Sequence, residues 1–292
     1  TKVLDLGLQP LAGNFSKNRK IALREKTFPL KAYYCSKCIY LQILDIINSD
    51  LLFKKYNYSS SDVKPLKLHF QRFANKIKNQ TKRDSHVKIF EIGCNDGVFL
   101  EEFLNNKRFS ILGIDPSKNI SNVAKKKGIE VINDHFNGSL ANQIKKKYGK
   151  FDLIVACNVF AHIDNISSII NGVKKIIDVN GDFIIEVHYL KALLNSYQYD
   201  TIYHEHMSYY SVFSLKKLFS RYGFNLNNLE KINTHSGSIR LYFSLSKKKI
   251  SSKIKNFINK ERIDIQTKIP NFQKYTEKHK ELIYNICKKY YH

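Results

Sequence analysis

The segment Val87-Lys88-Ile89-Phe90-Glu91-Ile92-Gly93-Cys94-Asn95-Asp96-Gly97 contains an apolar run of strand length that continues into a loop with two glycines. A helical pattern follows over residues 99–106. In a strand, loop and helix unit of this kind, the loop lies at the carboxyl end of the strand, where open α/β sheets bind their ligands. This segment therefore predicts both the fold class and the place of a ligand.

The same alternation of strand and helix continues along the chain. Repeated units of this length imply a parallel sheet with helices on both faces, so the predicted fold class is α/β. The informative side chains are those that directly follow each apolar run. The predicted strands are 87–92, 110–115, 130–132, 151–157 and 182–187, and the predicted helices are 65–82, 99–106, 119–127, 140–147 and 166–177.

Length and composition indicate a globular protein. The 292 residues correspond to about two domains at roughly 150 residues each. No apolar run approaches the roughly 18 residues that a membrane span needs, and no export signal is visible, so we expect no membrane partner. The five cysteines are odd in number and mostly far apart, which favours a reducing compartment and a cytoplasmic location. Because the chain starts at Thr1 and ends abruptly at His292, we expect that both ends are cut from a longer chain.

The net charge of +24, from 49 Lys+Arg against 25 Asp+Glu, raises the question of a nucleic-acid partner. The lysines come in scattered runs at 125–127, 145–147 and 247–249, without an arginine-rich stripe. We interpret them as solvent-exposed helix faces and expect no nucleic-acid partner. A non-catalytic nucleic-acid-binding protein stays the less favoured alternative. The charge would also favour an anionic small molecule.

Two of the cysteines form the motif Cys35-Ser36-Lys37-Cys38. Two thiolates at this spacing could hold one edge of a tetrahedral zinc site, and the alternative is a pair of ordinary cysteines in a turn. Cys94 and Cys157 lie in apolar runs, where we expect buried and unreactive thiols.

The loop after the first predicted strand favours a cationic or zwitterionic ligand. Gly93 stands where the backbone would approach a ligand closely, and Gly97 where a helix would begin. Asn95 occupies a position where a dinucleotide loop would carry glycine, so a bound diphosphate is disfavoured. Asp115 follows about 20 residues after the loop, the spacing at which a carboxylate accepts both ribose hydroxyls. The sequence thus predicts an adenosine-type site without a pyrophosphate, although Asp115 could instead cap the helix after Pro116.

These residues resemble the class I S-adenosylmethionine-dependent methyltransferases, whose motif reads E-x-G-x-x-x-G at the first strand with an acid at the end of the second. The resemblance implies a Rossmann-like mixed sheet with helices on both faces and S-adenosyl-L-methionine as cofactor. The positions it assigns to cofactor binding are Glu91, Gly93, Asn95, Asp96, Gly97, Asp115 and Asn158.

A narrower resemblance is to the nucleotide-deoxysugar C-methyltransferases. It rests on segments 6–15, 28–30, 35–38, 58–60, 91–100, 158–162 and 203–210. Members carry an N-terminal zinc module with two cysteine pairs, so Cys35 and Cys38 would be ligands of a Zn2+ site whose other pair is expected before Thr1. The implied organisation is a partial zinc-binding or cap module at 1–55, a linking helical segment at 56–85, a methyltransferase domain at 86–246 and the start of a truncated C-terminal domain at 247–292.

The segment Tyr203-His204-Glu205-His206 concentrates groups suited to forming a carbon nucleophile. A base must remove a proton beside a carbonyl, a carboxylate can orient an imidazole, and a phenol can donate to the forming enolate. The resemblance implies C-methylation of a nucleotide-linked 4-keto-deoxysugar beside its ketone. O- or N-methylation of another metabolite is the alternative. The catalytic positions that it assigns are His206 as base, with Tyr203, Glu205, His162 and Tyr58.

Several neighbouring residues carry weaker expectations. We expect His204 to be structural, and Tyr209 and Tyr210 to be packing residues. His188 ends a predicted strand and could approach the same cleft, without an assigned catalytic role. Arg240 could meet a phosphate, or it could be a structural arginine.

Overall fold

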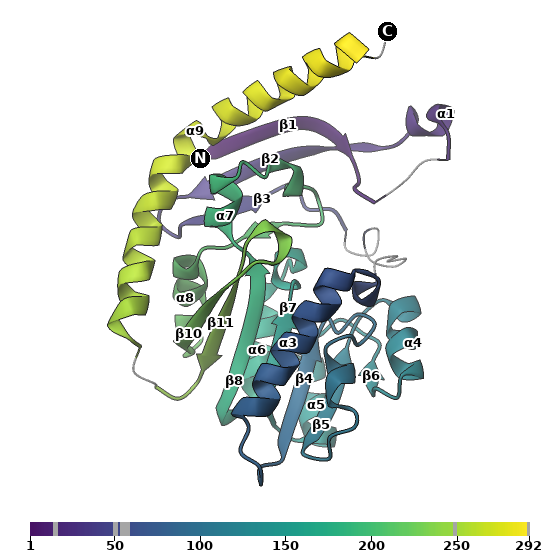
Figure 1. The fold of residues 1–292 in the computed structure, drawn as a ribbon, viewed down its shortest axis with the longest axis vertical. Coiled ribbons are helices and arrows are strands. Elements are labelled where there is room, and N and C mark those ends of the chain that lie inside the picture. Colours follow the sequence, from purple (N-terminus) through teal and green to yellow (C-terminus); the bar gives the residue numbers. More distant parts are fainter. Residues whose placement is uncertain (14–16, 49–51, 53–58, 248–249, 291–292) are drawn as a thin grey trace.

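A seven-stranded mixed sheet forms the centre of the molecule. The computed structural model describes residues 1–13, 17–48, 52, 59–247 and 250–290. The strand order is β10-β11-β8-β7-β4-β5-β6, in which β4 to β8 are parallel and β11 runs antiparallel to both β8 and β10 (Figure 1). The strands are β4 (Val87–Ile92), β5 (Phe109–Ile114), β6 (Val131–Ile132), β7 (Phe151–Cys157), β8 (Ile177–His188), β10 (Asn225–Ile232) and β11 (Ser238–Ser244).

Helices cover both faces of this sheet because alternate strand residues point to opposite sides. Phe90 and Ile154 belong to one apolar core, whereas the neighbouring Ile89 and Val155 belong to the other. The first core includes residues of α5, α6 and α8, and the second includes residues of α3 and α4. The helix bounds are α3 (Lys64–Gln80), α4 (Lys118–Lys126), α5 (Leu140–Tyr148), α6 (Ile166–Ile176), α7 (Leu190–Asn195) and α8 (Val212–Ser220).

A second sheet contains the N-terminal strands and one strand from the middle of the chain. Its antiparallel order is β1 (Lys2–Pro10), β2 (Thr27–Cys35), β3 (Tyr40–Ile43) and β9 (Ser208–Tyr209), and α1 (Arg19–Ala22) lies between β1 and β2 in the chain. Because β9 directly follows the Tyr203–His206 segment, its pairing with β3 ties that segment to the N-terminal sheet.

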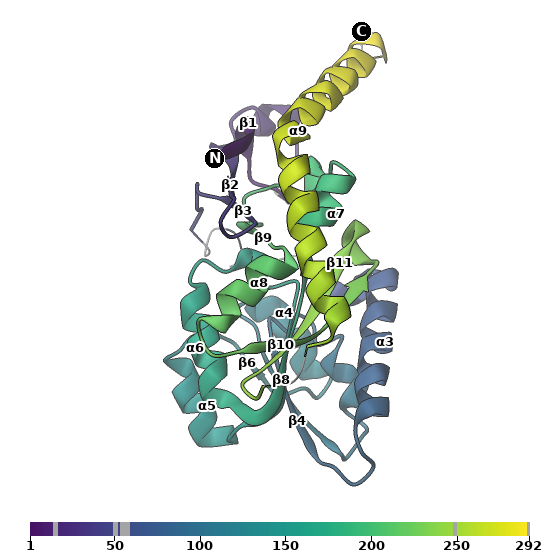
Figure 2. The same ribbon diagram turned by 90° about the vertical axis from the view of Figure 1, so that its left-hand side faces the viewer.

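The last helix, α9 (Ser252–Tyr290), packs along the N-terminal sheet and α7 (Figure 2). Ile265, Ile269 and Phe272 enter the apolar core that the sheet and α7 share. The C-terminal part of α9 projects beyond the rest of the molecule, with apolar side chains such as Leu282 exposed (Figure 1). Even so, none of the described helices is long and apolar enough to cross a membrane.

The predicted α/β fold is confirmed, whereas two element predictions are wrong. The expected helix at 99–106 is a short 3-10 helix, η2 (Leu100–Phe103), because Phe99, Leu100 and Phe103 are all buried and β5 starts shortly afterwards. The predicted strand 182–187 starts at Ile177, directly after α6. Gly181 makes this extension possible, since a Cβ there would lie 2.9 Å from the Asp152 carbonyl oxygen.

Candidate active site

A cavity of about 720 Å³ lies at the carboxyl ends of β4, β5, β7 and β8. Its lining includes the loops that follow these strands, Leu66 and Phe70 from α3, and the segment around Tyr203 and His206. In a chain with net charge +24, the described residues that line this cavity include no Lys or Arg. The acids among them are Glu91, Asp115, Asp134, Asp164 and Asp200. The cavity thus favours a cation over an anion.

The two glycines of the loop after β4 are required by contacts within the protein. Gly93 and Gly97 both have left-handed backbone, with φ of +69° and +77°. A Cβ on Gly93 would lie 2.4 Å from the Val159 side chain, and one on Gly97 would lie 2.3 Å from the Ile129 side chain. Both glycines thus let the loop pack against its neighbours, and Gly93 also lines the cavity, where the sequence predicts a close approach to a ligand.

We expect Gly97→Ala to lower the free energy of unfolding by about 1–3 kcal/mol more than Gly128→Ala, the range for overpacking a close-packed site. Gly128 is a matched control because its φ is +93° and a Cβ there would have nothing within 4 Å. Both variants carry the strain of a left-handed alanine, so their difference isolates the contact with Ile129. Urea denaturation measures it, and equal effects would contradict the packing role.

Asp115 fixes the loop and faces the cavity at the same time. Its Oδ2 accepts a hydrogen bond from the Asn95 N–H at 2.9 Å, and its Oδ1 accepts one from the Ser117 N–H at 2.9 Å. Burial raises the pKa of this carboxyl group, although the two backbone N–H groups oppose the rise. The Ser117 hydroxyl also bonds to this carboxyl group, so three of its roughly four acceptor sites are used within the protein. Capping by Asp115 and a bond to a ribose hydroxyl are thus compatible.

Glu91 is an acid with an unfulfilled oxygen at the cavity wall. Its side chain is buried, and its Oε2 has no hydrogen-bond partner among the described residues. Burial, together with the charges of Asp115 and Asp96, raises its pKa well above the ordinary value. A cationic ligand would relieve this repulsion. The sulfonium, ammonium and ribose of S-adenosylmethionine fit such a site, with Glu91 near the cationic end and Asp115 for the hydroxyls.

The remaining predicted cofactor residues divide into two groups. Asn95 and Asn158 line the cavity, as do Glu91, Gly93 and Asp115. Asn158 has a φ of +57°, and its N–H donates to the Glu186 carbonyl at 2.8 Å. Asp96 and Gly97 are not among the lining residues. The structure therefore does not place Asp96 or Gly97 in contact with a ligand in this cavity.

The opposite wall brings together three of the predicted catalytic residues. His206 Nδ1 donates to the Thr201 carbonyl at 3.1 Å, because a carbonyl oxygen can only accept. The other ring nitrogen, Nε2, then accepts from the Tyr203 hydroxyl at 2.9 Å. The ring centroid of His162 lies 4.9 Å from that of His206, and all three residues line the cavity.

Both imidazoles are neutral at physiological pH. Burial, reinforced by the neighbouring His162, lowers the pKa of His206 to about 3. Burial likewise lowers the pKa of His162 to about 4. His206 therefore presents an unprotonated Nε2 to the cavity.

The Glu205 side chain is not part of this group in the structure. The backbone carbonyl of Glu205 accepts from His162 Nδ1 at 2.8 Å, but Glu205 does not line the cavity. The expectation that a carboxylate orients the catalytic imidazole is corrected, because the Thr201 carbonyl, at the end of the 3-10 helix η4 (Tyr199–Thr201), takes the Nδ1–H. Tyr58 lies outside the described residues.

Several other residues named in the sequence analysis lie near this wall. His204 is buried and hydrogen-bonds to the Pro29 carbonyl at 3.1 Å, so it is structural. Tyr209 and Tyr210 are buried packing residues, as expected. His188 lines the cavity and is 2.9 Å from Gln198 Oε1. The sequence reasoning missed His235 and Thr201, which also line the cavity, because neither lies in a strand end or an acid-base motif.

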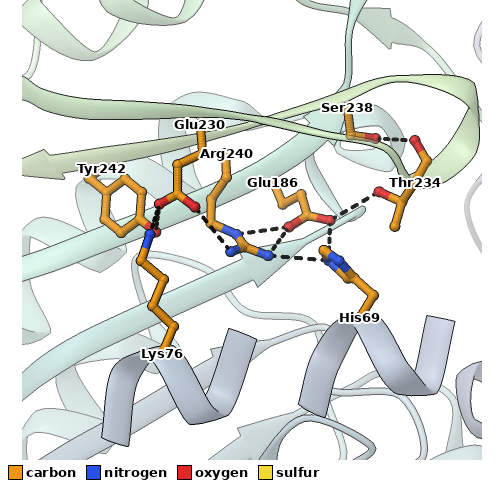
Figure 3. A network of polar contacts seen from close by, with 8 residues as sticks. All are labelled: His69, Lys76, Glu186, Glu230, Thr234, Ser238, Arg240 and Tyr242. Carbon is orange, nitrogen blue, oxygen red and sulfur yellow. Dashed lines mark hydrogen bonds and ion pairs between the residues drawn. The ribbon is translucent and has the colours of Figure 1, made fainter. Parts of the chain in front are cut away.

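A network of charged and polar side chains joins α3 to β8, β10 and β11 (Figure 3). Glu186 Oε2 accepts from Arg240 Nε at 2.9 Å and Nη2 at 2.7 Å, and Glu186 Oε1 is 2.7 Å from His69 Nε2 on α3. The Arg240 guanidinium lies 3.5 Å from the centroid of the Phe73 ring. Of the two alternatives for Arg240, the structure supports the structural arginine over a phosphate ligand.

The cysteine pair supplies only part of a zinc site. The Cys38 N–H donates to the Cys35 carbonyl at 3.2 Å, which places both residues in one turn. A structural zinc needs four ligands, and within the described part of the chain no group of three or more His, Cys, Asp or Glu residues could hold a metal. Zinc therefore does not fit as a complete site here. Cys94 and Cys157 are buried, and burial raises their pKa well above the ordinary value, as expected for unreactive thiols.

Two protein-family models match the chain. The family described as "Methyltransferase domain" matches residues 65–229, which include the cavity loops and the Tyr203–His206 segment. The family described as "Putative zinc binding domain" matches residues 1–53, which include Cys35 and Cys38.

The chain is also similar to individual proteins. It is 32% identical over 240 residues to the C-methyltransferase NovU of Streptomyces niveus, covering 82% of this chain and 57% of that relative. The chain thus spans little more than half of that protein's length. A solved S-adenosylmethionine-dependent methyltransferase of Clostridium acetobutylicum is 15% identical, with a TM-score of 0.47, covering 64% of this chain and 94% of that one. The magnesium protoporphyrin IX methyltransferase of Synechocystis with bound SAH is 14% identical, with a TM-score of 0.47, covering 62% and 83%.

Proposed function

Because the chain belongs to the methyltransferase-domain family and is an S-adenosylmethionine-dependent enzyme of the class I fold, we propose that it methylates carbon. The proposed acceptor is a nucleotide-linked 4-keto-deoxysugar, and the methylated position is the carbon beside the ketone. The observation that carries this proposal is the neutral His206, hydrogen-bonded to Tyr203, in the wall of a cavity that has acids at its cofactor end.

The cofactor end of the cavity suits S-adenosylmethionine, which supplies an electrophilic methyl group when bound. A cationic group beside the unpaired Glu91 Oε2 would favour the ionised form of this acid, and Asp115 stands at the strand end suited to the ribose. Because the described lining residues include no Lys or Arg, we propose that only the ketosugar enters this cavity and that the diphosphate of the acceptor stays outside it.

In the proposed mechanism, His206 Nε2 takes the proton from the carbon beside the ketone. The bond from Nδ1–H to the Thr201 carbonyl holds the tautomer that leaves Nε2 free to accept a proton. The Tyr203 hydroxyl, which donates to Nε2 in the free protein, turns to donate to the enolate oxygen. Burial keeps the pKa of His206 low, and His162 shapes the wall beside it, with its own Nδ1–H held by the Glu205 carbonyl.

A similarity supports the choice of carbon over oxygen or nitrogen. NovU, 32% identical to this chain, is described as a C-methyltransferase. When the accepting atom is oxygen or nitrogen, it carries its own lone pair, and no base is needed to remove a proton from carbon. The His206–Tyr203 pair is what carbon methylation requires.

We expect the chain to bind S-adenosylhomocysteine with a micromolar Kd and Asp115→Ala to weaken that binding about 100-fold, or about 2.8 kcal/mol. The variant loses the acceptor for the ribose and also the two bonds that hold Asn95 and Ser117. Isothermal titration calorimetry measures both values. Gly128→Ala, at an open position away from the cavity, is the control for an unrelated substitution. Unchanged affinity in Asp115→Ala would remove this carboxylate from the cofactor site.

A further inference from the structure

Residues Ser59, Ser60 and Ser61 are fastened to the loop after β4 by three hydrogen bonds. The Ser59 hydroxyl donates to Asp96 Oδ2 at 2.8 Å, and the Ser61 N–H donates to the same oxygen at 3.1 Å. The Ser60 N–H donates to Asn95 Oδ1 at 2.9 Å. These contacts join segments 35 to 37 positions apart in the sequence. We refer to Ser59–Ser61 as the serine segment.

Asn95 makes two separate hydrogen bonds, one through its backbone to Asp115 and one through its side chain to the serine segment. The residue has a φ of +50°, a conformation that asparagine tolerates better than most residues. Its N–H donates to Asp115 Oδ2 at 2.9 Å. A continuous series of bonds therefore runs from the carboxylate at the end of β5, through Asn95, to the Ser60 amide.

Asp96 is turned toward the serine segment and is not part of the cavity lining. Its side chain is completely buried and it is absent from the lining residues, although Asn95 and Ser60 on either side of the contact both line the cavity. Its Oδ2 accepts both bonds from the serine segment. A buried carboxylate that accepts such bonds contributes more than a neutral acceptor would.

The serine segment leads directly into one wall of the cavity. Ser60 begins η1 (Ser60–Asp62), which is followed at once by α3. Leu66 and Phe70, on the first turns of α3, line the cavity beside Ser60. The position of this wall thus depends on where the serine segment is held.

We propose that Asn95 and Asp96 are positioning residues, which hold the serine segment and the start of α3 against the cavity through their side chains, and are not ligands of the cofactor. Their effect on the reaction passes through the wall that Ser60, Leu66 and Phe70 form. The inference rests on the proposed function only where turnover is measured.

The test is Asn95→Gly, which keeps the left-handed backbone and the bond to Asp115 but removes the acceptor for Ser60. We expect amide hydrogen exchange in a peptide spanning the serine segment to become about fivefold faster, the effect of one lost hydrogen bond. The Kd for S-adenosylhomocysteine stays within about threefold of the parent value. Asn95→Asp restores an acceptor and should restore slow exchange.

Two serine variants add a matched pair. Ser59→Ala removes a hydroxyl that donates to Asp96, so it should also speed exchange in the segment. Ser61→Ala leaves its N–H bond to Asp96 in place and removes a hydroxyl whose only described neighbour is Ser59 Oγ at 3.3 Å, so exchange should stay slow. Unchanged exchange in both Asn95→Gly and Ser59→Ala would overturn the proposal.

Measuring turnover is the second test of the positioning role. With a nucleotide-linked 4-keto-deoxysugar, Asn95→Gly should lower kcat about tenfold with an unchanged KM for S-adenosylmethionine, the pattern of an interaction that matters in the transition state. A Kd for S-adenosylhomocysteine that rises more than about tenfold would make Asn95 a cofactor ligand and overturn the inference. If the parent chain turns over no ketosugar, the proposed function fails, while the exchange and affinity measurements still decide the positioning role.

Discussion

His206→Ala is expected to lower kcat for methylation of a nucleotide-linked 4-keto-deoxysugar about 1,000-fold, within the range for loss of a general base. The Nε2 that accepts from Tyr203 is the group placed to take the proton from carbon. Affinity for S-adenosylhomocysteine should stay within about threefold, because the carboxylates that suit the cofactor, Glu91 and Asp115, come from β4 and the end of β5, and His206 bonds to Thr201 and Tyr203 instead. Transfer of a labelled methyl group and exchange of solvent deuterium into the ketosugar both measure the loss.

Tyr203→Phe and Tyr209→Phe form a matched pair for this prediction. Each removes one hydroxyl near His206, but the Tyr203 hydroxyl bonds to Nε2 whereas the Tyr209 hydroxyl bonds to the Thr201 carbonyl at 3.2 Å. Tyr203→Phe should lower kcat about 10- to 100-fold, as expected for a lost enolate donor, and Tyr209→Phe should be close to the parent. Retained methylation by His206→Ala would favour an oxygen or nitrogen acceptor instead.

The pH dependence follows from the same burial. An exposed histidine with the ordinary pKa of 6.5 would lose its basic form as the pH falls through that value, but His206 has a pKa lowered to about 3. Turnover by the parent chain should therefore not fall through protonation of His206 between pH 8 and pH 5, and a loss of activity with an apparent pKa near 6.5 would contradict this. The unfolded chain binds the proton more readily, so His206 contributes stability above pH 6.5 that is lost as the pH falls toward 3.

The parallel strands of the central sheet could be predicted because they are largely buried and appear as apolar runs, whereas the antiparallel strands β10 and β11 were not predicted. The predicted bounds of β4 and β7, 87–92 and 151–157, are the bounds found in the structure. The helix expected after β4 failed for a tertiary reason: Phe99 stacks on Phe73, with ring centroids 5.1 Å apart, and holds the segment in a tight 3-10 turn. No local pattern shows such a contact, because Phe73 comes from α3.

The candidate site was predictable where a residue lies at the carboxyl end of a strand or shortly after it, and less so elsewhere. Glu91, Asp115 and His162 reach the cavity because the carboxyl ends of parallel strands meet at one edge. The roles of Asn95 and Asp96 depend on the serine segment, more than 30 positions earlier. Likewise, the carbonyl that orients His206 belongs to a turn and leaves no side-chain signal in the sequence.

The second large effect concerns the network of charged side chains that joins α3 to β8 and β11. Arg240→Met is expected to lower the free energy of unfolding by about 3–5 kcal/mol, because it leaves Glu186 buried without its main cationic partner. Methionine keeps an apolar contact with Phe73 but supplies no charge. The pKa of Glu186 is held below its ordinary 4.5 by His69 and Arg240 against the effect of burial. Its ionised form therefore stabilises the fold at neutral pH, and urea denaturation at pH 7 measures the loss.

The double variant Glu186→Leu with Arg240→Met distinguishes a lost partner from a lost side chain. Removing both charges leaves no buried ion, so the double variant should recover most of the stability that Arg240→Met loses. Lys147→Met, which breaks the exposed pair with Glu130, is the control and should leave the urea midpoint unchanged. If the double variant were as unstable as the sum of the single variants, packing by the arginine would explain the effect, and its charge would not. Recovery would show that each ion of the Glu186–Arg240 pair stabilises the fold mainly by neutralising the buried charge of the other. In the parent chain, His69 and Phe73 hold α3 on the sheet through their contacts with this pair.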